Sequence, residues 1–302
     1  MNAAGEERTT ESTTPEMGAE SETATSAAAT SEAEATAATI ERILVALDAS
    51  PHSLAALQAA AQLATLMQAE LEGLYVEDIN LLRLGRYSFV REVGSYSASL
   101  RPLDTRAIER EFQIQAARIR RAMAQTAVSA NVRWSFHTTR GAVSTEVFTA
   151  AQDAAMLTLG RVGRSVGKRF GSTAQRALQG TRRPVLIAGE GGFVYPLIVF
   201  YDATPAGERA LHLAVRLMRG RDDAFTLLVA PLSDESQADY ESRVQTLVHQ
   251  LEEQEIHCRA GSARPGNDLL NLLRDMDAGT LIVPIAHAAV INELSRSAIV
   301  VP

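Results

Sequence analysis

Short segments that are apolar almost throughout alternate along this chain with longer segments in which apolar residues recur every three or four positions. The first kind includes "ILVAL" (43–47), "LIVFY" (197–201) and "AIVV" (298–301), and the second kind includes residues 104–127 and 239–256. Continuous apolar runs indicate strands covered on both faces, and the three-to-four spacing indicates amphipathic helices. The alternation predicts an α/β protein with a parallel sheet, right-handed crossovers and helices on both faces.

This pattern occurs twice. Residues 43–64 align without gaps on residues 197–218, which lie 154 positions later. In both segments an apolar strand ends in aspartate, a hydroxyl residue follows as a helix N-cap, and proline fills the first helical turn, where its missing N–H costs nothing. The paired residues are Asp48 and Asp202, Ser50 and Thr204, and Pro51 and Pro205. The sequence therefore predicts two tandem copies of one unit.

The copies differ in two connections. The first copy has 30 surplus residues after its second strand, and we place most of them in residues 77–104. A flap over a ligand, a dimer contact and a variable surface loop are all consistent with this insertion. The second copy is ten residues shorter before its last strand, where residues 285–297 contain no glycine. We expect residues 40–191 and 192–302 to form two tandem Rossmann-like domains, each with an open parallel five-stranded sheet, the second shortened and degenerate.

Residues 1–39 differ from the rest of the chain in composition and charge. They contain eight glutamates and one arginine, no aromatic residue and almost no large aliphatic residue. Such a segment cannot bury enough apolar surface to offset its chain entropy, so we expect a disordered acidic tail. This tail is either a solubilising leader or a segment that is phosphorylated or binds a partner. The formal net charge of −7 therefore resides in the tail, which leaves the body neutral. A neutral body predicts no binding of nucleic acid.

Other features of the sequence bear on the cellular compartment of the protein. The single Cys258 excludes an intrachain disulfide and fits a reducing environment. No apolar run approaches the roughly 20 residues needed to cross a bilayer. The acidic start of the chain lacks the apolar core of a secretory signal and the arginines of a transit peptide. The expected location is the cytoplasm.

The segment "GRVGRSVGKRFGST" (160–173) is the candidate for chemistry. It follows an apolar strand and precedes a helix, so its backbone N–H groups and the helix dipole point toward one place. Glycine lets the backbone approach an anion closely, and Arg161, Arg164, Lys168 and Arg169 supply positive charge. The Walker and dinucleotide glycine patterns are both absent. From the residues alone, a phosphate cradle and a solvated basic turn both remain open.

Three stretches together resemble the universal stress protein family: "ILVALDAS" (43–50), "LYVED" (74–78) and the spacing Gly160-x2-Gly163 leading to Gly171-Ser172. The resemblance implies a five-stranded parallel α/β domain and a stress-response regulator that binds ATP, as Mg-ATP, through the motif G-x2-G-x9-G-[S/T]. The contact residues that it implies are Asp48, Ala49, Val76, Gly160, Arg161, Gly163, Gly171, Ser172 and Thr173. Seven residues separate Gly163 from Gly171 here instead of nine.

In the second copy Asp202 remains, but the glycine-rich loop is missing. We therefore expect nucleotide in the first domain only, with the second domain as a built-in pairing partner. The resemblance also implies dimerisation through the last strand, so a homodimer is a further expectation. The alternative is a protein-interaction or dimerisation module of the same fold that binds no nucleotide.

Catalysis finds little support in the residues. No histidine pair or cysteine has metal-ligand spacing, and the adjacent Glu77 and Asp78 are expected to diverge at a strand end. A nucleotidyl-transfer enzyme would need a phosphate-activating motif, and none is present. His52, beside the expected site, is either a ligand contact or simply exposed. Slow ATP hydrolysis is the most that we expect.

Overall fold

The computed structural model describes residues 41–87, 90–93, 100–102, 104–161, 171–189, 191–276 and 279–302. The acidic tail, Gly163 and most of the glycine-rich loop lie outside the described residues. In the described part, no helix is long and apolar enough to cross a membrane.

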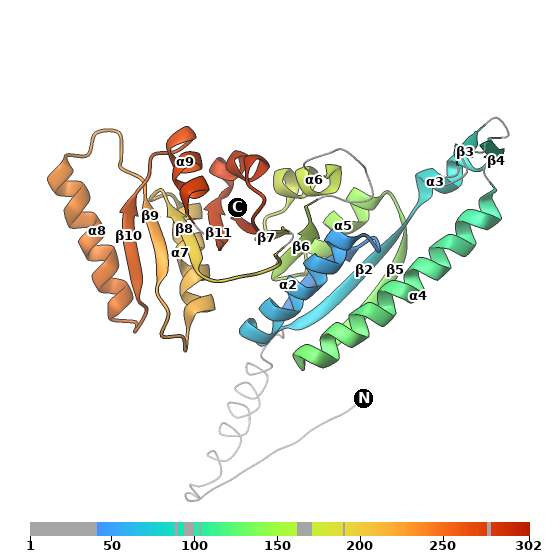
Figure 1. Ribbon diagram of the computed structural model, residues 1–302, viewed down its shortest axis with the longest axis horizontal. Helices are drawn as coiled ribbons and strands as arrows, with labels where there is room; N and C mark the ends of the chain where they lie inside the picture. Colours follow the sequence, from blue (N-terminus) through green and yellow to red (C-terminus); the bar gives the residue numbers. More distant parts are fainter. Residues whose placement is uncertain are drawn as a thin grey trace, which may run out of the picture. The chain divides into compact units, whose positions relative to one another are not determined.

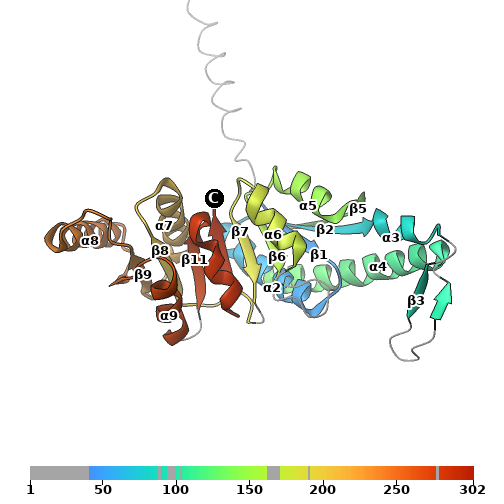
Figure 2. The same ribbon diagram turned by 90° about the horizontal axis from the view of Figure 1, so that it is seen from above.

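The first copy runs from β1 to β7 and alternates strand and helix as its sequence predicts (Figure 1). Its sheet strands are β1 (Arg42–Leu47), β2 (Glu70–Asp78), β5 (Trp134–Gly141), β6 (Met156–Gly160) and β7 (Val185–Ala188). Its crossover helices are α2 (Pro51–Met67), α4 (Thr105–Ala130), α5 (Val143–Ala151) and α6 (Ser172–Gly180). In Figure 2, α5 and α6 lie on one side of β1 and β2, and α2 and α4 lie on the other, as a doubly covered sheet requires.

The second copy runs from β8 to β12 and repeats this order. Its strands are β8 (Leu197–Tyr201), β9 (Phe225–Val229), β10 (Cys258–Ser262), β11 (Thr280–Pro284) and β12 (Ala298–Val301). Its helices are α7 (Pro205–Met218), α8 (Gln237–Glu252), α9 (Asn267–Asp275) and the 3₁₀ helix η1 (Ile285–Glu293). The segment without glycine thus forms η1, where the first copy has its glycine-rich loop and α6.

The strands of both copies form one ten-stranded sheet with the order β10-β9-β8-β11-β12-β7-β6-β1-β2-β5. Strands β12 and β7 pair antiparallel, with Ile299 opposite Leu186, and the other pairings described in this sheet are parallel. The predicted α/β class with parallel strands is therefore confirmed. The structure adds that the two five-stranded sets join edge to edge, so that neither β7 nor β12 is left as an open edge.

Local chemistry explains the helix starts. Ser50 Oγ accepts a hydrogen bond from Ser53 N at 3.2 Å, and Thr204 Oγ1 accepts one from Gly207 N at 3.1 Å. Each N-cap is followed by proline at the first helical position. These contacts confirm the predicted caps and fix where the chain turns away from the ends of β1 and β8.

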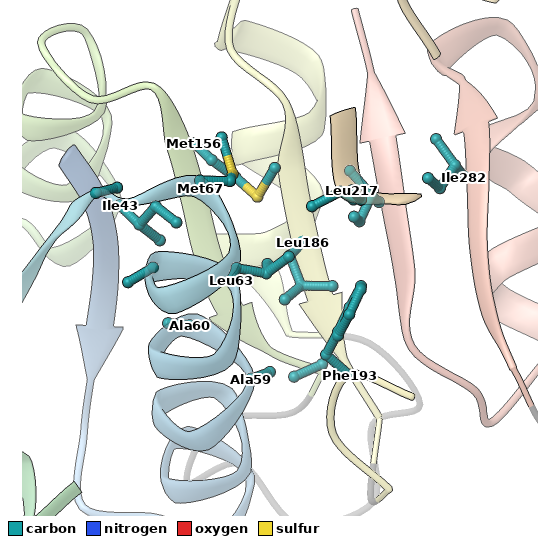
Figure 3. Packing of buried hydrophobic residues seen from close by; sticks show 14 of the residues in the cluster. Ile43, Ala59, Ala60, Leu63, Met67, Met156, Leu186, Phe193, Leu217 and Ile282 are labelled. Atoms are coloured by element: carbon teal, nitrogen blue, oxygen red, sulfur yellow. The ribbon is translucent and has the colours of Figure 1, made fainter. Parts of the chain in front are cut away.

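The core is continuous between the two copies. One buried cluster lies between the sheet and α2, α4, α7 and α8 and draws on both copies. Figure 3 shows part of it, with Leu63 and Leu186 from the first copy and Leu217 and Ile282 from the second. All four side chains are at most 1% exposed. Apolar burial therefore holds the two copies together in addition to the pairing of β7 with β12.

The insertion after β2 has secondary structure of its own. It contains α3 (Ile79–Leu84) and the antiparallel pair β3 (Arg91–Val93) and β4 (Leu100–Pro102). Asp78 Oδ1 accepts from Asn80 N at 2.9 Å and so caps α3. The insertion therefore leaves directly from the carboxyl end of β2, beside the end of β1.

Candidate functional site

The strand order of the first copy reverses at β1. From β1 the chain proceeds to β2 and β5 on one side and then returns to β6 and β7 on the other. In open α/β sheets the loops that follow such a pair of strands diverge, and the crevice outside their carboxyl ends is the usual ligand site. The carboxyl ends of β1 and β6 are therefore where the candidate site is built.

The turn after β1 presents a carboxylate. Asp48 Oδ1 accepts a hydrogen bond from Ser50 N at 3.0 Å, which fixes the side chain over its own turn. Ala49 adopts a left-handed backbone with φ 60°. Within the described part of the chain, this backbone contact is the one hydrogen bond that the Asp48 carboxylate makes. Its second oxygen therefore has no hydrogen-bond partner among the described residues.

Val76 lies level with this turn on the neighbouring strand. Leu47 of β1 pairs with Tyr75 of β2, so Val76 is one step farther along, beside Asp48. Its side chain is half-buried. The sheet register thus brings together two residues that the resemblance assigns to the adenosine.

Gly160 ends β6 where the strand meets α2. A Cβ atom at Gly160 would lie 2.8 Å from the carbonyl carbon of His52 and 2.9 Å from its oxygen. The missing side chain is therefore required by the approach of α2, whatever its part in ligand contact. His52 consequently meets the site region through its backbone at this point.

Arg161 closes the base of the glycine-rich loop with its backbone. Its carbonyl oxygen accepts from Gly171 N at 2.9 Å, and its own N–H donates to Ala188 O at 3.2 Å. Its side chain points elsewhere. Nη1 donates to Ile291 O at 2.8 Å and Nη2 donates to Arg296 O at 2.7 Å, both in the second copy. The guanidinium expected at the nucleotide is thus engaged by carbonyl groups of the other copy.

Helix α6 begins directly after this loop without a side-chain cap. Gly171 is the N-cap, with extended φ and ψ of −72° and 146°, and no side chain caps the helix at this position. Ser172 is exposed and Thr173 half-exposed in the first turn. In the described part of the chain no side chain caps this helix start, so its N–H groups and the positive end of the helix dipole can interact with an anion.

The adjacent carboxylates at the end of β2 have separate partners. Glu77 Oε2 pairs with Arg140 Nη2 at 2.7 Å on β5, whereas Asp78 caps α3. The two carboxylates thus have partners on different elements, Glu77 on β5 and Asp78 on α3. No group of three or more metal-ligating side chains occurs among the described residues.

In the second copy, side chains of that copy occupy the aspartate at the equivalent strand end. Asp202 Oδ1 accepts from Thr204 N at 3.1 Å and from Thr204 Oγ1 at 2.6 Å. Asp202 Oδ2 lies 2.8 Å from Nε2 of His287 on η1. The His287 ring also meets Phe200 edge to face, with centroids 4.9 Å apart. The carboxylate that is open in the first copy is thus occupied in the second.

This His–Asp contact is well shielded from solvent. The side chains of Asp202 and His287 are 8% and 18% exposed. Burial raises the pKa of the Asp202 carboxyl, but hydrogen bonds from Thr204 and His287 outweigh it and bring the pKa below its usual value. Sequence reasoning missed His287, because only the absence of glycine from residues 285–297 hinted at a different structure there.

Comparison with known proteins agrees with this geometry. The family model described as the universal stress protein family matches residues 39–189. A universal stress protein from Archaeoglobus fulgidus DSM 4304 has a similar structure, with 14% identity and a TM-score of 0.66, covering 86% of this chain and 97% of its own. A universal stress protein from Pseudomonas aeruginosa UCBPP-PA14 gives 13% identity and a TM-score of 0.52, with 87% and 93% covered. No curated protein sequence matches the chain significantly.

Proposed function

Because the chain belongs to the universal stress protein family, we propose that it is a stress-response regulator that binds ATP, or a related nucleotide, in its first copy alone. In this proposal residues 40–191 are the nucleotide-binding domain, and residues 192–302 are a second domain that pairs with it as a built-in partner. The proposed location is the cytoplasm, which fits the single Cys258.

The observation that carries the proposal is the uncapped start of α6 at the carboxyl end of β6. Gly171 provides no capping side chain, and Ser172 and Thr173 follow it with hydroxyl groups. Phosphate oxygens would accept from these N–H and O–H donors and gain from the helix dipole. Asp48, after the adjacent strand β1, and Val76, on β2 beyond it, would contact the ribose and base.

Arg161 has a different part in this proposal from the one that the resemblance implies. Its guanidinium donates to two carbonyls of the second copy, so its backbone, and not its charge, would shape the site. The phosphates would then depend on N–H groups, hydroxyls and the Mg²⁺ that accompanies ATP. Gly163 belongs to the proposed contact set but lies outside the described residues.

The restriction to the first copy rests on His287. In the second copy the His287 ring is hydrogen-bonded to Asp202 Oδ2, the carboxylate oxygen to which a ribose hydroxyl would have to donate. A ligand would have to displace this contact and the packing of His287 on Phe200. We further propose that the first copy binds ATP without efficient turnover, since Glu77 and Asp78 are each bound elsewhere.

A second candidate is the interaction module that binds no nucleotide. The observation that favours it is the exposure of large apolar side chains beside the site, on and just after α3. Leu81, Leu84 and Tyr87 are 44%, 43% and 53% exposed. Exposed apolar groups that cluster in this way are typical of surfaces that bind another protein, including a second copy of the chain.

Calorimetric titration of the full chain with Mg-ATP tests the proposal. Ser172→Asp places a carboxylate at the first position of α6, where it favours the helix but repels phosphate. We expect the wild type to bind and Ser172→Asp to bind at least tenfold more weakly. Gln237→Asp, the same change in charge at the first position of α8, is the matched control and should bind as the wild type does. The interaction module becomes the better reading if wild-type protein freed of co-purified nucleotide gives no heat up to millimolar ATP.

A further inference from the structure

Arg161 connects the base of the candidate site to the second copy. Through its backbone it links the two ends of the glycine-rich loop, Gly171 N donating to its carbonyl oxygen at 2.9 Å. Through its side chain it donates to Ile291 O on η1 and to Arg296 O just before β12, at 2.8 and 2.7 Å. One residue thus touches both the first crevice and the segment that closes the second crevice.

These contacts require arginine. The Arg161 guanidinium is half-buried, and burial lowers its pKa, yet no carboxylate pairs with it among the described residues. Two carbonyls in different directions satisfy its terminal nitrogens, and Nε has no acceptor in the described part of the chain. Burying a cation without a counter-charge costs free energy, so the hydrogen bonds that compensate it must have good geometry. The planar guanidinium of arginine can donate to two carbonyls at once, and no other side chain carries this group.

The segment before β12 is also packed tightly against the connection that follows β7. Ser297 Oγ accepts from Gly189 N at 2.9 Å and donates to Gly192 O, so the start of β12 is held against the connection after β7. A Cβ atom at Gly189 would collide with the backbone of Ser295. Backbone packed on backbone transmits a displacement because it cannot absorb one by a rotamer change.

Helix η1 is held at two points that belong to different crevices. Ile291, near its end, accepts from Arg161 at the base of the first crevice. His287, one turn earlier, bonds to Asp202 in the second crevice. Resting on the proposed function above, we propose that Arg161 is a positioning residue that couples nucleotide occupancy of the first crevice to η1 and to the closure of the second crevice. In this proposal the position of η1 in the second copy depends on whether nucleotide is bound to the first copy.

Hydrogen exchange of the full chain with and without saturating Mg-ATP tests this coupling. In the wild type we expect ATP to slow exchange in residues 171–176 and also, about fivefold or more, in residues 285–297. In Arg161→Gln, ATP should still protect residues 171–176 but no longer residues 285–297. Arg183→Gln is the matched control, because Arg183 donates to Gln152 O within the first copy. It should behave as the wild type does.

A second variant tests the coupling in the opposite direction, from η1 to ATP binding. Its position lies outside the first crevice. Linkage requires that loosening η1 must weaken ATP binding if ATP tightens η1. His287→Ala removes the contact with Asp202, and we expect it to raise the Kd for ATP about fivefold or more. An unchanged Kd in His287→Ala overturns the coupling. ATP binding by the wild type without protection of residues 285–297 also overturns it. Either result is compatible with nucleotide binding in the first copy. Absence of ATP binding by the wild type overturns the proposed function and the coupling together.

Discussion

Replacing Gly160 by alanine adds one methyl group at the meeting point of β6 and α2. The new Cβ would lie 2.8 Å from the carbonyl carbon of His52 and 2.9 Å from its oxygen. Both atoms belong to the backbone of the first turn of α2, which Ser50 and Pro51 fix in place. No side-chain rotation relieves the contact, so strand and helix have to move apart by several tenths of an ångström.

Overpacking of this kind costs about 1–3 kcal/mol. For a chain of this size, each kcal/mol corresponds to roughly 2–4 °C in Tm, so a cost of about 2 kcal/mol lowers Tm by roughly 4–8 °C. The same displacement separates the turn at Asp48 from the end of β6. We therefore expect Gly160→Ala to weaken ATP binding as well as stability.

Urea unfolding followed by circular dichroism, together with a thermal scan, measures the first effect, and calorimetry measures the second. Gly191→Ala is the control, because nothing lies within 4 Å of a Cβ atom there and no left-handed backbone is required. It should leave both properties unchanged. A Gly160→Ala protein as stable as the wild type would refute the reasoning, since it would mean that β6 and α2 do not approach so closely.

Three further predictions concern buried or half-buried groups. Thr158→Val should be neutral or raise stability by up to about 1 kcal/mol in urea unfolding, because its buried hydroxyl has no partner among the described residues. Thr280→Val should lower stability by about 1–2 kcal/mol, because Val194 N loses its acceptor. Burial, with the nearby Glu252 carboxylate, raises the pKa of Cys258 to about 11, so alkylation at pH 8 should be about a hundredfold slower in native than in unfolded protein. The lowered pKa of Asp202 stabilises the fold above about pH 4, and this contribution is lost as pH falls further, so Asp202→Asn should flatten the acid limb of the stability profile. Equal effects of the two valines, equal alkylation rates, or an unchanged acid limb would each contradict the corresponding prediction.

The elements and their caps could be predicted because their causes are local. Ser50 and Thr204 cap their helices three residues away, and the proline that follows each leaves few conformations open. The apolar runs identified the strands for the same reason, since a strand covered on both faces has no polar position to spare. The repeat added independent support, because the same turn chemistry recurs 154 residues later.

The direction of side chains across the junction could not be predicted in this way. Arg161 lies among glycines and near other cations in the sequence, which suggests a phosphate ligand. Its acceptors Ile291 and Arg296 are 130 and 135 residues away and are backbone carbonyls, which every residue carries. Residue type therefore holds no signal for that contact, and only the pairing of β7 with β12 brings the groups together.

The two copies show how the length of one connection changes the use of one scaffold. In the first copy, 24 residues (161–184) join β6 to β7 and include α6, which begins after the N-cap Gly171. In the second copy only residues 285–297 join β11 to β12, too few for the same arrangement, and the chain coils at once into η1. That short path places His287 on Asp202 and Ile291 against Arg161. A shortened connection thus brings a histidine onto the strand-end carboxylate of its own copy and at the same time supplies a carbonyl that accepts from Arg161 of the other copy. For this reason substitutions in η1 should be assayed for their effect on the first copy as well as on the second.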